Sequence, residues 1–210
     1  MDDDVLKMAA RGHTSSDTKK AAKMIRDYGF NLGLQMMTGL PGDTLQKSLM
    51  TAREIASLGA SSTRIYPTLV IKGTYLETLW REKKYQPQTL KQAIEWLIPI
   101  MDIFTQYNIN VLRVGLHPTE GFLKGTDLLA GPFHPSLRQL IISERWKTLL
   151  TKTISPQPNK SLILKVNPKD MAYASGYKGN NKKHLQQWFK SVKLKHDNSL
   201  TQGTFYADYC

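Results

Sequence analysis

Apolar and polar positions along the first 118 residues follow two rhythms, one typical of helices and one of buried strands. Helical spacing covers residues 2–12, 14–28, 45–58, 74–85 and 90–107. Apolar runs between them predict strands at 30–37, 63–68 and 110–116. Because strands and helices alternate, the pattern predicts an α/β fold with parallel strands covered by helices. Three such strands are too few for a closed barrel, so we expect part of a (β/α) barrel.

Residues at the ends of these segments support the same assignment. Residues 14–17 supply N-cap candidates, and Asp43 is expected to cap the helix that follows it. Gly29 and Gly59 come directly after two helical segments, where glycine is a frequent stop. Pro99 lies within the longest helical segment and is expected to kink it.

The pattern changes after residue 118. The expected elements are a glycine-rich loop at 119–131, a helix at 135–150, a linker at 155–158, a strand at 161–166, a helix at 181–192, and short strands near 192–195 and 204–208. The sequence therefore predicts three parts. They are a barrel portion at 1–118, a loop and helical extension at 119–154, and a basic α+β tail at 155–210.

Charge is the most unusual property of the composition. The 210 residues carry a formal net charge of +12, which favours polyanionic partners such as nucleic acid, although a solvated basic surface is the alternative. Nine lysines and three aspartates follow Pro156, so the excess is concentrated in the tail. No apolar stretch is long enough to span a membrane, and the start of the chain resembles no secretory signal, so we expect a cytoplasmic protein.

Candidate metal ligands are sparse. Cys210 is the only cysteine, which excludes an internal disulfide and an all-cysteine metal site. The five histidines lie far apart, without acidic residues at ligand spacing, at positions 13, 117, 134, 184 and 196. We therefore expect no metal site within the chain, and no catalytic nucleophile–base pair stands out.

Four stretches, in this order and spacing, carry a family resemblance. They are Asp3-Asp4-Val5-Leu6 leading into Arg11-Gly12-His13-Thr14, then Gly33 to Thr44, Arg64 to Thr74, and Leu79-Trp80 through Tyr85-Gln86-Pro87. Together they resemble the radical S-adenosylmethionine (radical SAM) superfamily. The likeness is strongest to the radical SAM core of the Elongator acetyltransferase catalytic subunit, with oxygen-independent coproporphyrinogen oxidases next. It covers residues 1–118 and implies a TIM-barrel-like fold, S-adenosylmethionine and a [4Fe–4S] cluster.

The resemblance also implies roles for single residues. Arg11 stands where relatives pair an arginine with the carboxylate of S-adenosylmethionine, which a guanidinium can bind through two parallel hydrogen bonds. Gln35 stands where relatives carry a polar residue that binds the ribose or amino-acid part. The turn Gly39-Leu40-Pro41-Gly42 lies at the carboxyl end of a strand, where parallel sheets bind ligands, although a tight turn without a ligand is the alternative.

Further residues are assigned to the walls of the same cavity. Tyr66 is expected beside the cofactor, and Thr68 and Lys72 follow it toward the substrate. Arg113, on the last strand of the barrel portion, should have an anionic partner if it points inward, because a buried unpaired arginine is costly. Ordinary strand packing and a solvated lysine are the alternatives.

The chain lacks the three cysteines that hold the iron–sulfur cluster in radical SAM enzymes. The first hypothesis is therefore a C-terminal portion of such an enzyme, supplying the SAM-binding and substrate side and acting on RNA by analogy with tRNA uridine modification. It would be inactive in radical chemistry without an N-terminal cluster-binding half, which is its expected partner.

Two other hypotheses remain open. A non-enzymatic RNA-binding module would use lysines for phosphate and the aromatic residues Tyr177, Trp188 and Phe189 for stacking. The lysine candidates are Lys178, Lys182, Lys183 and Lys190. Alternatively these aromatics belong to the core and the lysines are solvated. A third hypothesis is a remnant whose exposed strand edges promote self-association.

Overall fold

The computed structural model describes residues 1–210, which form two compact units, Met1–Leu137 and Arg138–Cys210. We call them the N-terminal and the C-terminal unit. The boundary lies inside the segment 119–154 that the sequence assigns to an extension. No helix is both long enough and apolar enough to cross a membrane.

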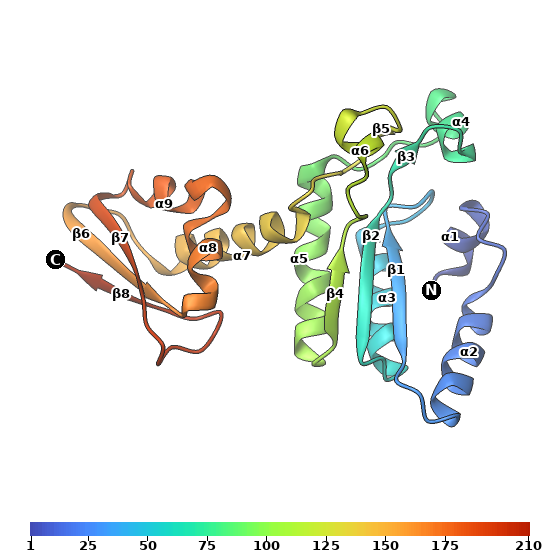
Figure 1. Cartoon of the computed structure of the whole chain (residues 1–210), viewed down its shortest axis with the longest axis horizontal. Coiled ribbons are helices and arrows are strands. Elements are labelled where there is room, and N and C mark those ends of the chain that lie inside the picture. The colour runs from blue at the N-terminus through green and yellow to red at the C-terminus, as the bar shows by residue number, and fades with distance from the viewer. The chain divides into compact units, whose positions relative to one another are not determined.

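The N-terminal unit is built on a three-stranded parallel sheet (Figure 1). Its strands are β1 (Gly33–Thr38), β2 (Ser62–Pro67) and β4 (Asn110–Val114), in the order β1-β2-β4. Helices α3 (Leu45–Ser57) and α5 (Leu90–Gln106) pack against each other and cover one face. The predicted α/β fold with parallel strands is confirmed.

Alternating side chains explain which face of the sheet is covered. Met36, Ile65 and Val114 are buried toward the helices. They pack with the apolar stripes of the two covering helices, which include fully buried Ala52 and Phe104. Residues between them in the strands point to the opposite face, which α3 and α5 leave open.

The helices begin at side chains that cap them. Thr14 forms a capping box with Asp17 before α2 (Ser15–Asp27). The N-cap of α3 is Thr44, whose hydroxyl accepts a hydrogen bond from the Lys47 amide, and not the predicted Asp43. The Asp43 carboxylate instead accepts a hydrogen bond from the Gly39 amide, at the other end of the turn. Pro99 lies inside α5, which continues through it as one helix.

The segment after β2 contains structure that the sequence analysis missed. Here β3 (Val70–Ile71) pairs antiparallel with β5 (Leu128–Ala130). The prediction of a loop at 119–131 is therefore wrong. Thr119 caps a short helix, which ends at left-handed Gly125, and the apolar run that follows forms β5. The remaining helices of the unit are α1 (Asp3–Met8), α4 (Tyr75–Arg81) and α6 (Glu120–Lys124).

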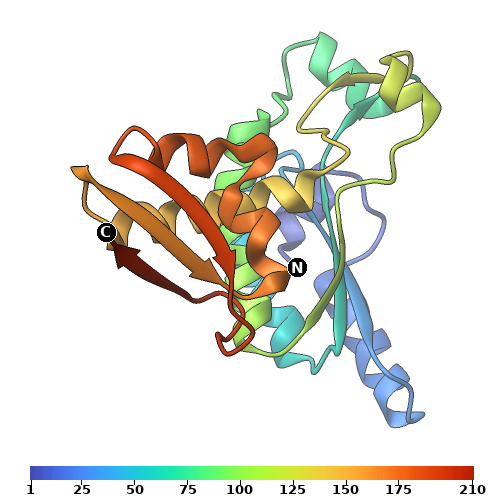
Figure 2. The ribbon, with the colours of Figure 1, turned by 60° about the vertical axis from the view of Figure 1, so that its left-hand side comes forward.

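The C-terminal unit contains a second three-stranded sheet in the order β7-β6-β8. Central β6 (Gln157–Val166) pairs parallel with β7 (Phe189–His196) and antiparallel with β8 (Phe205–Tyr209). Its helical elements are α7 (Leu137–Thr153), η1 (Pro168–Asp170), α8 (Met171–Ser175), η2 (Tyr177–Gly179) and α9 (Asn180–Leu185). Figure 2 shows these helices on one face of the sheet.

The core of this unit corrects the predicted helix at 181–192. That helix ends at Leu185, and β7 begins at Phe189. From Val192 onward the side chains alternate, because Val192 and Leu194 pack on the buried side of β6 while Lys193 and Lys195, which alternate with them, are exposed. The predicted linker at 155–158 is also partly strand, since β6 already begins at Gln157.

Candidate functional site

The turn after β1, Gly39 to Gly42, has a constrained backbone. Gly39 and Gly42 both have φ +74°, a left-handed conformation that favours glycine. A Cβ at Gly39 would lie 2.7 Å from the side-chain oxygen of Gln88, and one at Gly42 would lie 2.5 Å from the sulfur of Met8. The turn therefore needs glycine for its backbone conformation, while the contacts involve the ends of flexible side chains.

Asp43 holds this turn from within. Its Oδ2 accepts hydrogen bonds from the Gly39 amide and the Ser48 hydroxyl, both at 2.8 Å, and its Oδ1 accepts from the Thr44 amide at 2.8 Å. Burial raises the pKa of the Asp43 carboxyl above its ordinary value, even though these hydrogen bonds favour the charged form. The carboxylate thus ties the end of β1 to the start of α3.

Tyr85 holds the same turn from outside. Its hydroxyl donates to the Gly39 carbonyl at 2.6 Å, and the side chain is buried. Burial, helped by the charge of Asp43, raises the pKa of Tyr85 to about 12, so the phenol keeps its proton at neutral pH. Both the amide and the carbonyl of Gly39 are therefore occupied by side chains.

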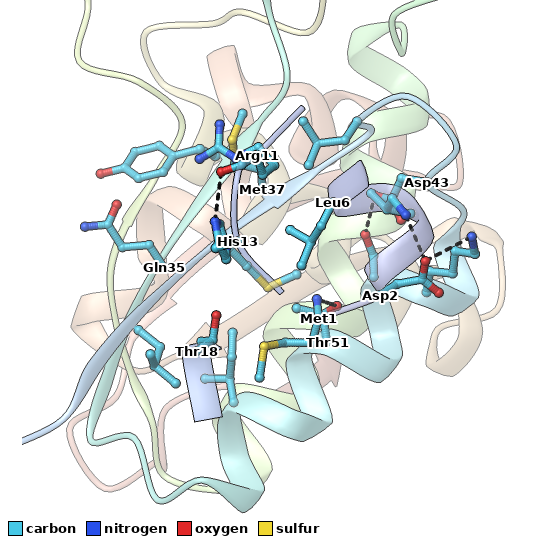
Figure 3. A pocket seen from close by; sticks show the side chains of 18 residues that line it. Met1, Asp2, Leu6, Arg11, His13, Thr18, Gln35, Met37, Asp43 and Thr51 are labelled. Carbon is cyan, nitrogen blue, oxygen red and sulfur yellow. Dashed lines mark hydrogen bonds and ion pairs between the residues drawn. The ribbon is translucent and has the colours of Figure 1, made fainter. Parts of the chain in front are cut away.

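A cavity of about 240 Å³ adjoins this turn (Figure 3). Side chains from both faces of β1 line it, so it lies along the free edge of that strand. The lining residues come from the start of the chain, α1, the α1–α2 connection, α2, β1, the turn, β2 and α3, and include Arg11, Gln35, Leu40, Asp43, Lys47 and Tyr66.

The structure brings four predicted cofactor residues together in this cavity, namely Arg11, Gln35, Leu40 and Tyr66. The Arg11 guanidinium is exposed and has no ion-pair partner, while its backbone carbonyl contacts the His13 Nδ1 at 3.0 Å. Gln35 is exposed on β1, and its side chain also has no hydrogen-bond partner. A cationic group and an amide are thus both available to a ligand.

The other residues of the turn border a second cavity, of about 430 Å³. Gly39, Pro41 and Gly42 line it, and Leu40 lines both cavities. The side-chain amide of Gln88, next to Gly39 in the same lining, is buried without a partner for either its oxygen or its nitrogen.

The predicted substrate residues do not enter the first cavity. Thr68 is buried, and its amide and hydroxyl both donate to the Thr38 carbonyl, at 2.9 and 2.8 Å. Lys72 is exposed at the end of β3, where its amide donates to the Asp127 carbonyl. Arg113 is exposed on the open face of the sheet. Thr68 therefore holds β2 to the end of β1.

Sequence analysis missed Arg64 as a candidate. Gln35, Arg64 and Arg113 are paired across the three strands and form one row on the open face. Neither guanidinium has a hydrogen-bond or ion-pair partner, so two like charges lie side by side and would attract an anion. The period of two along β2, with Thr63 and Ile65 buried, is the signal that identifies Arg64.

The predicted RNA-binding residues of the C-terminal unit separate into two groups. Lys178, Lys183 and Lys190 are exposed and Lys182 is half-buried. Phe189, however, is only 4% exposed in the core, so its predicted stacking role is wrong. Trp188 packs against the same core and meets the His184 ring edge-on, with centroids 4.8 Å apart.

Metal-ligating side chains do not gather anywhere in residues 1–210. No group of three or more histidine, cysteine, aspartate or glutamate side chains is placed to hold an ion, and Cys210 is exposed. The residues present therefore do not fit a [4Fe–4S] cluster.

Comparisons with known proteins bear on this geometry. Residues 60–147 match the Radical_SAM C-terminal domain. The tRNA uridine(34) acetyltransferase of Dehalococcoides mccartyi is 38% identical over 90 residues, covering 41% of this chain and 20% of that protein. Elongator complex protein 3 of Homo sapiens is 30% identical over 110 residues, covering 50% and 20%. The resemblance to the radical SAM, Elongator-like family is confirmed. This radical SAM-like chain spans about a fifth of these curated relatives.

A solved structure supports the fold of the radical SAM-like chain. The archaeal Elp3 of Methanocaldococcus infernus with an N-terminal deletion superposes with a TM-score of 0.60. The match has 24% sequence identity and covers 71% of this chain and 34% of that chain. At this identity the likeness concerns the fold alone.

Proposed function

We propose that the N-terminal unit supplies the SAM-binding and substrate side of a radical SAM barrel that acts on RNA. The observation that carries this proposal is the convergence of Arg11, Gln35 and Leu40 in one cavity beside the Gly39–Gly42 turn. Arg11 belongs to the first of the four resemblance stretches, and Gln35 and Leu40 belong to the second. The third stretch contributes Tyr66 to the same cavity.

The chemistry of the cavity suits the amino-acid end of S-adenosylmethionine. An unpaired guanidinium binds a carboxylate through two parallel hydrogen bonds, and the Gln35 amide offers both a donor and an acceptor. The volume of about 240 Å³ is smaller than the roughly 300 Å³ at which ligand pockets begin. The rest of the ligand would therefore extend past Tyr66 toward the open face of the sheet.

When cluster-bound, S-adenosylmethionine supplies an organic radical in this family. The chain provides one cysteine and no cluster ligands, so an N-terminal cluster-binding half is proposed as its partner. The residues described here would then orient the cofactor and border the substrate, and the chain by itself would be inactive in radical chemistry.

An RNA substrate is supported by charge and by the named relatives. One curated relative is named as a tRNA uridine(34) acetyltransferase, and another is named as Elongator complex protein 3. On the open face, the unpaired guanidiniums of Arg64 and Arg113 are suited to phosphate.

Binding of S-adenosylmethionine to the purified chain tests the proposal by isothermal titration calorimetry. We expect Arg11→Gln to weaken binding about tenfold or more, because it removes a charge-assisted bidentate contact. Arg53→Gln, at an exposed arginine of α3 outside the cavity, is the matched control and should bind as the wild type does. Absence of binding, or equal binding by wild type and Arg11→Gln, would contradict the proposal.

A further inference from the structure

The C-terminal unit joins two parallel strands through two helices and a four-residue loop. The order is β6, η1, α8, the loop Gly176-Tyr177-Lys178-Gly179, whose last three residues are η2, then α9 and β7. Strands β6 and β7 are adjacent in the sheet. We call residues 176–179 the GYKG loop. Gly176 has φ +83° and ψ +159°, Lys178 has φ +53°, and Gly179 has φ +75°. Three of its four residues therefore have positive φ.

The GYKG loop is fixed from the side of the core. A Cβ at Gly176 would lie 2.6 Å from the backbone nitrogen of Asn181, so the two segments touch directly. Asn181 is 3% exposed, and its Nδ2 donates to the Ser143 carbonyl at 2.9 Å and to the Tyr173 carbonyl at 3.3 Å. A buried amide thus holds the loop to α7 and α8.

The outer side of the GYKG loop is open. A Cβ at Gly179 would meet no atom within 4 Å, and Lys178 is exposed, with its ammonium 5.6 Å from the centre of the Tyr177 ring. Glycine flanking an exposed cation lets another backbone approach the loop closely. The loop therefore combines a fixed base with an accessible tip.

The chain segment that contains the loop has basic residues and no acidic ones. No aspartate or glutamate occurs between Met171 and His196, and this stretch contains six lysines, at positions 178, 182, 183, 190, 193 and 195. The acidic residue that precedes it, Asp170, is buried and accepts a hydrogen bond from the Gly203 amide at 2.8 Å. No carboxylate of this segment competes with an anion at the loop.

We propose that the GYKG loop clamps the sugar–phosphate backbone of single-stranded RNA. KH modules use a Gly-x-x-Gly loop for this purpose, holding four nucleotides by their backbone. Here Lys178 would contact phosphate, while the lysines of α9 provide longer-range attraction. Phe189 is buried, so recognition uses the backbone rather than stacking on that residue. The choice of RNA over DNA rests on the proposed function. The proposal that the loop holds a sugar–phosphate backbone rests on the loop geometry and is independent of that function.

Fluorescence anisotropy with the full chain and a labelled single-stranded RNA of about 12 nucleotides tests this proposal. Lys178→Asp reverses the charge with a residue that tolerates positive φ. We expect it to weaken binding about tenfold, and Lys178→Asn, which also suits this backbone, to weaken it about threefold. Circular dichroism and thermal unfolding show whether each variant stays folded.

Lys193→Glu is the matched control because it makes the same change of charge elsewhere. Lys193 is exposed on β7 and pairs with Ile163, on the sheet face opposite buried Leu162 and Leu164. We expect less than about a twofold loss for this variant. An equal loss in Lys178→Asp and Lys193→Glu would overturn the proposal, because diffuse charge would then explain binding.

Two further oligonucleotides complete the test. Duplex RNA and single-stranded DNA of the same sequence should bind more weakly than the single-stranded RNA, and equal or tighter binding of either would overturn the assignment to single-stranded RNA. The measurements are made without S-adenosylmethionine. The two proposals are separable by their variants. Arg11→Gln should lose cofactor binding and keep RNA binding, and Lys178→Asp should lose RNA binding and keep cofactor binding.

Discussion

The Tyr85 hydroxyl donates to the Gly39 carbonyl at 2.6 Å, joining residues that are 46 positions apart in the sequence. This contact links the end of β1 to the segment after α4. Both residues lie in stretches that carry the family resemblance. The shape of the turn beside the cavity therefore depends on a distant part of the chain.

Tyr85→Phe removes this hydrogen bond and leaves the Gly39 carbonyl without its partner. We expect a loss of about 1–2 kcal/mol in the free energy of unfolding, measured by urea denaturation at neutral pH. The pKa of Tyr85 is raised in the folded state to about 12, so this stability is present below the ordinary pKa and lost as the pH rises through 12. The difference between wild type and Tyr85→Phe should therefore shrink between about pH 10 and 12. A constant difference would contradict this cause.

Asp43→Asn tests the cost of the buried charge. Burial raises the pKa of Asp43 in the folded protein, so protonation is more favourable in the folded than in the unfolded state. Stability from this group is then present below its ordinary pKa and decreases as the pH rises through the raised value. We expect the free energy of unfolding of wild type, relative to Asp43→Asn, to fall from about pH 3 to neutral pH. A relative increase over this range would show that the hydrogen bonds outweigh burial.

Two glycines of the GYKG loop should respond differently to alanine. Gly176 has a backbone conformation open almost only to glycine, and a Cβ there would collide with Asn181, so Gly176→Ala should cost about 3 kcal/mol or more. Gly179→Ala meets only the left-handed penalty, about 1–2 kcal/mol. Thermal unfolding followed by circular dichroism compares them, and equal losses would show that the collision has no effect.

Arg64→Gln should slightly stabilise the N-terminal unit at low salt. Arg64 and Arg113 lie opposite each other on neighbouring strands without anionic partners, and like charges in this position are unfavourable by about 0.2–1 kcal/mol. The gain should disappear at about 1 M salt, where the repulsion is screened. Urea denaturation at both salt concentrations provides the measurement, and a loss of stability at low salt would point to an unrecognised partner of Arg64.

Much of the N-terminal fold could be predicted because its signals are local. Helical spacing, capping residues and apolar runs specified the three parallel strands and the two covering helices. The pairing of β3 with β5 could not be predicted, because both strands are short and lie about 57 residues apart, so only tertiary contact defines them. In the C-terminal unit, Phe189 and Val192 fit a helix or a strand, and packing against β6 decides between them.

The candidate site was predictable only in part. The resemblance identified Arg11 and Gln35, and the structure places both at one cavity. Their assignment to a cofactor stays a prediction. The role of Thr68 as a tie to Thr38 depends on a contact between strands, which the sequence does not contain. Arg64 was missed because a single exposed arginine in a strand carries no signal until its neighbours across the sheet are known.

A ligand in the cavity and a strand paired with the free edge of β1 would be neighbours. Any strand that pairs with this edge becomes a wall of the cavity, and so changes the surroundings of a ligand held by Arg11 and Gln35. By thermodynamic reciprocity, the ligand must alter the affinity of that strand by the same factor. If a cofactor is held here as proposed, its affinity would therefore report whether the edge of β1 is paired or free.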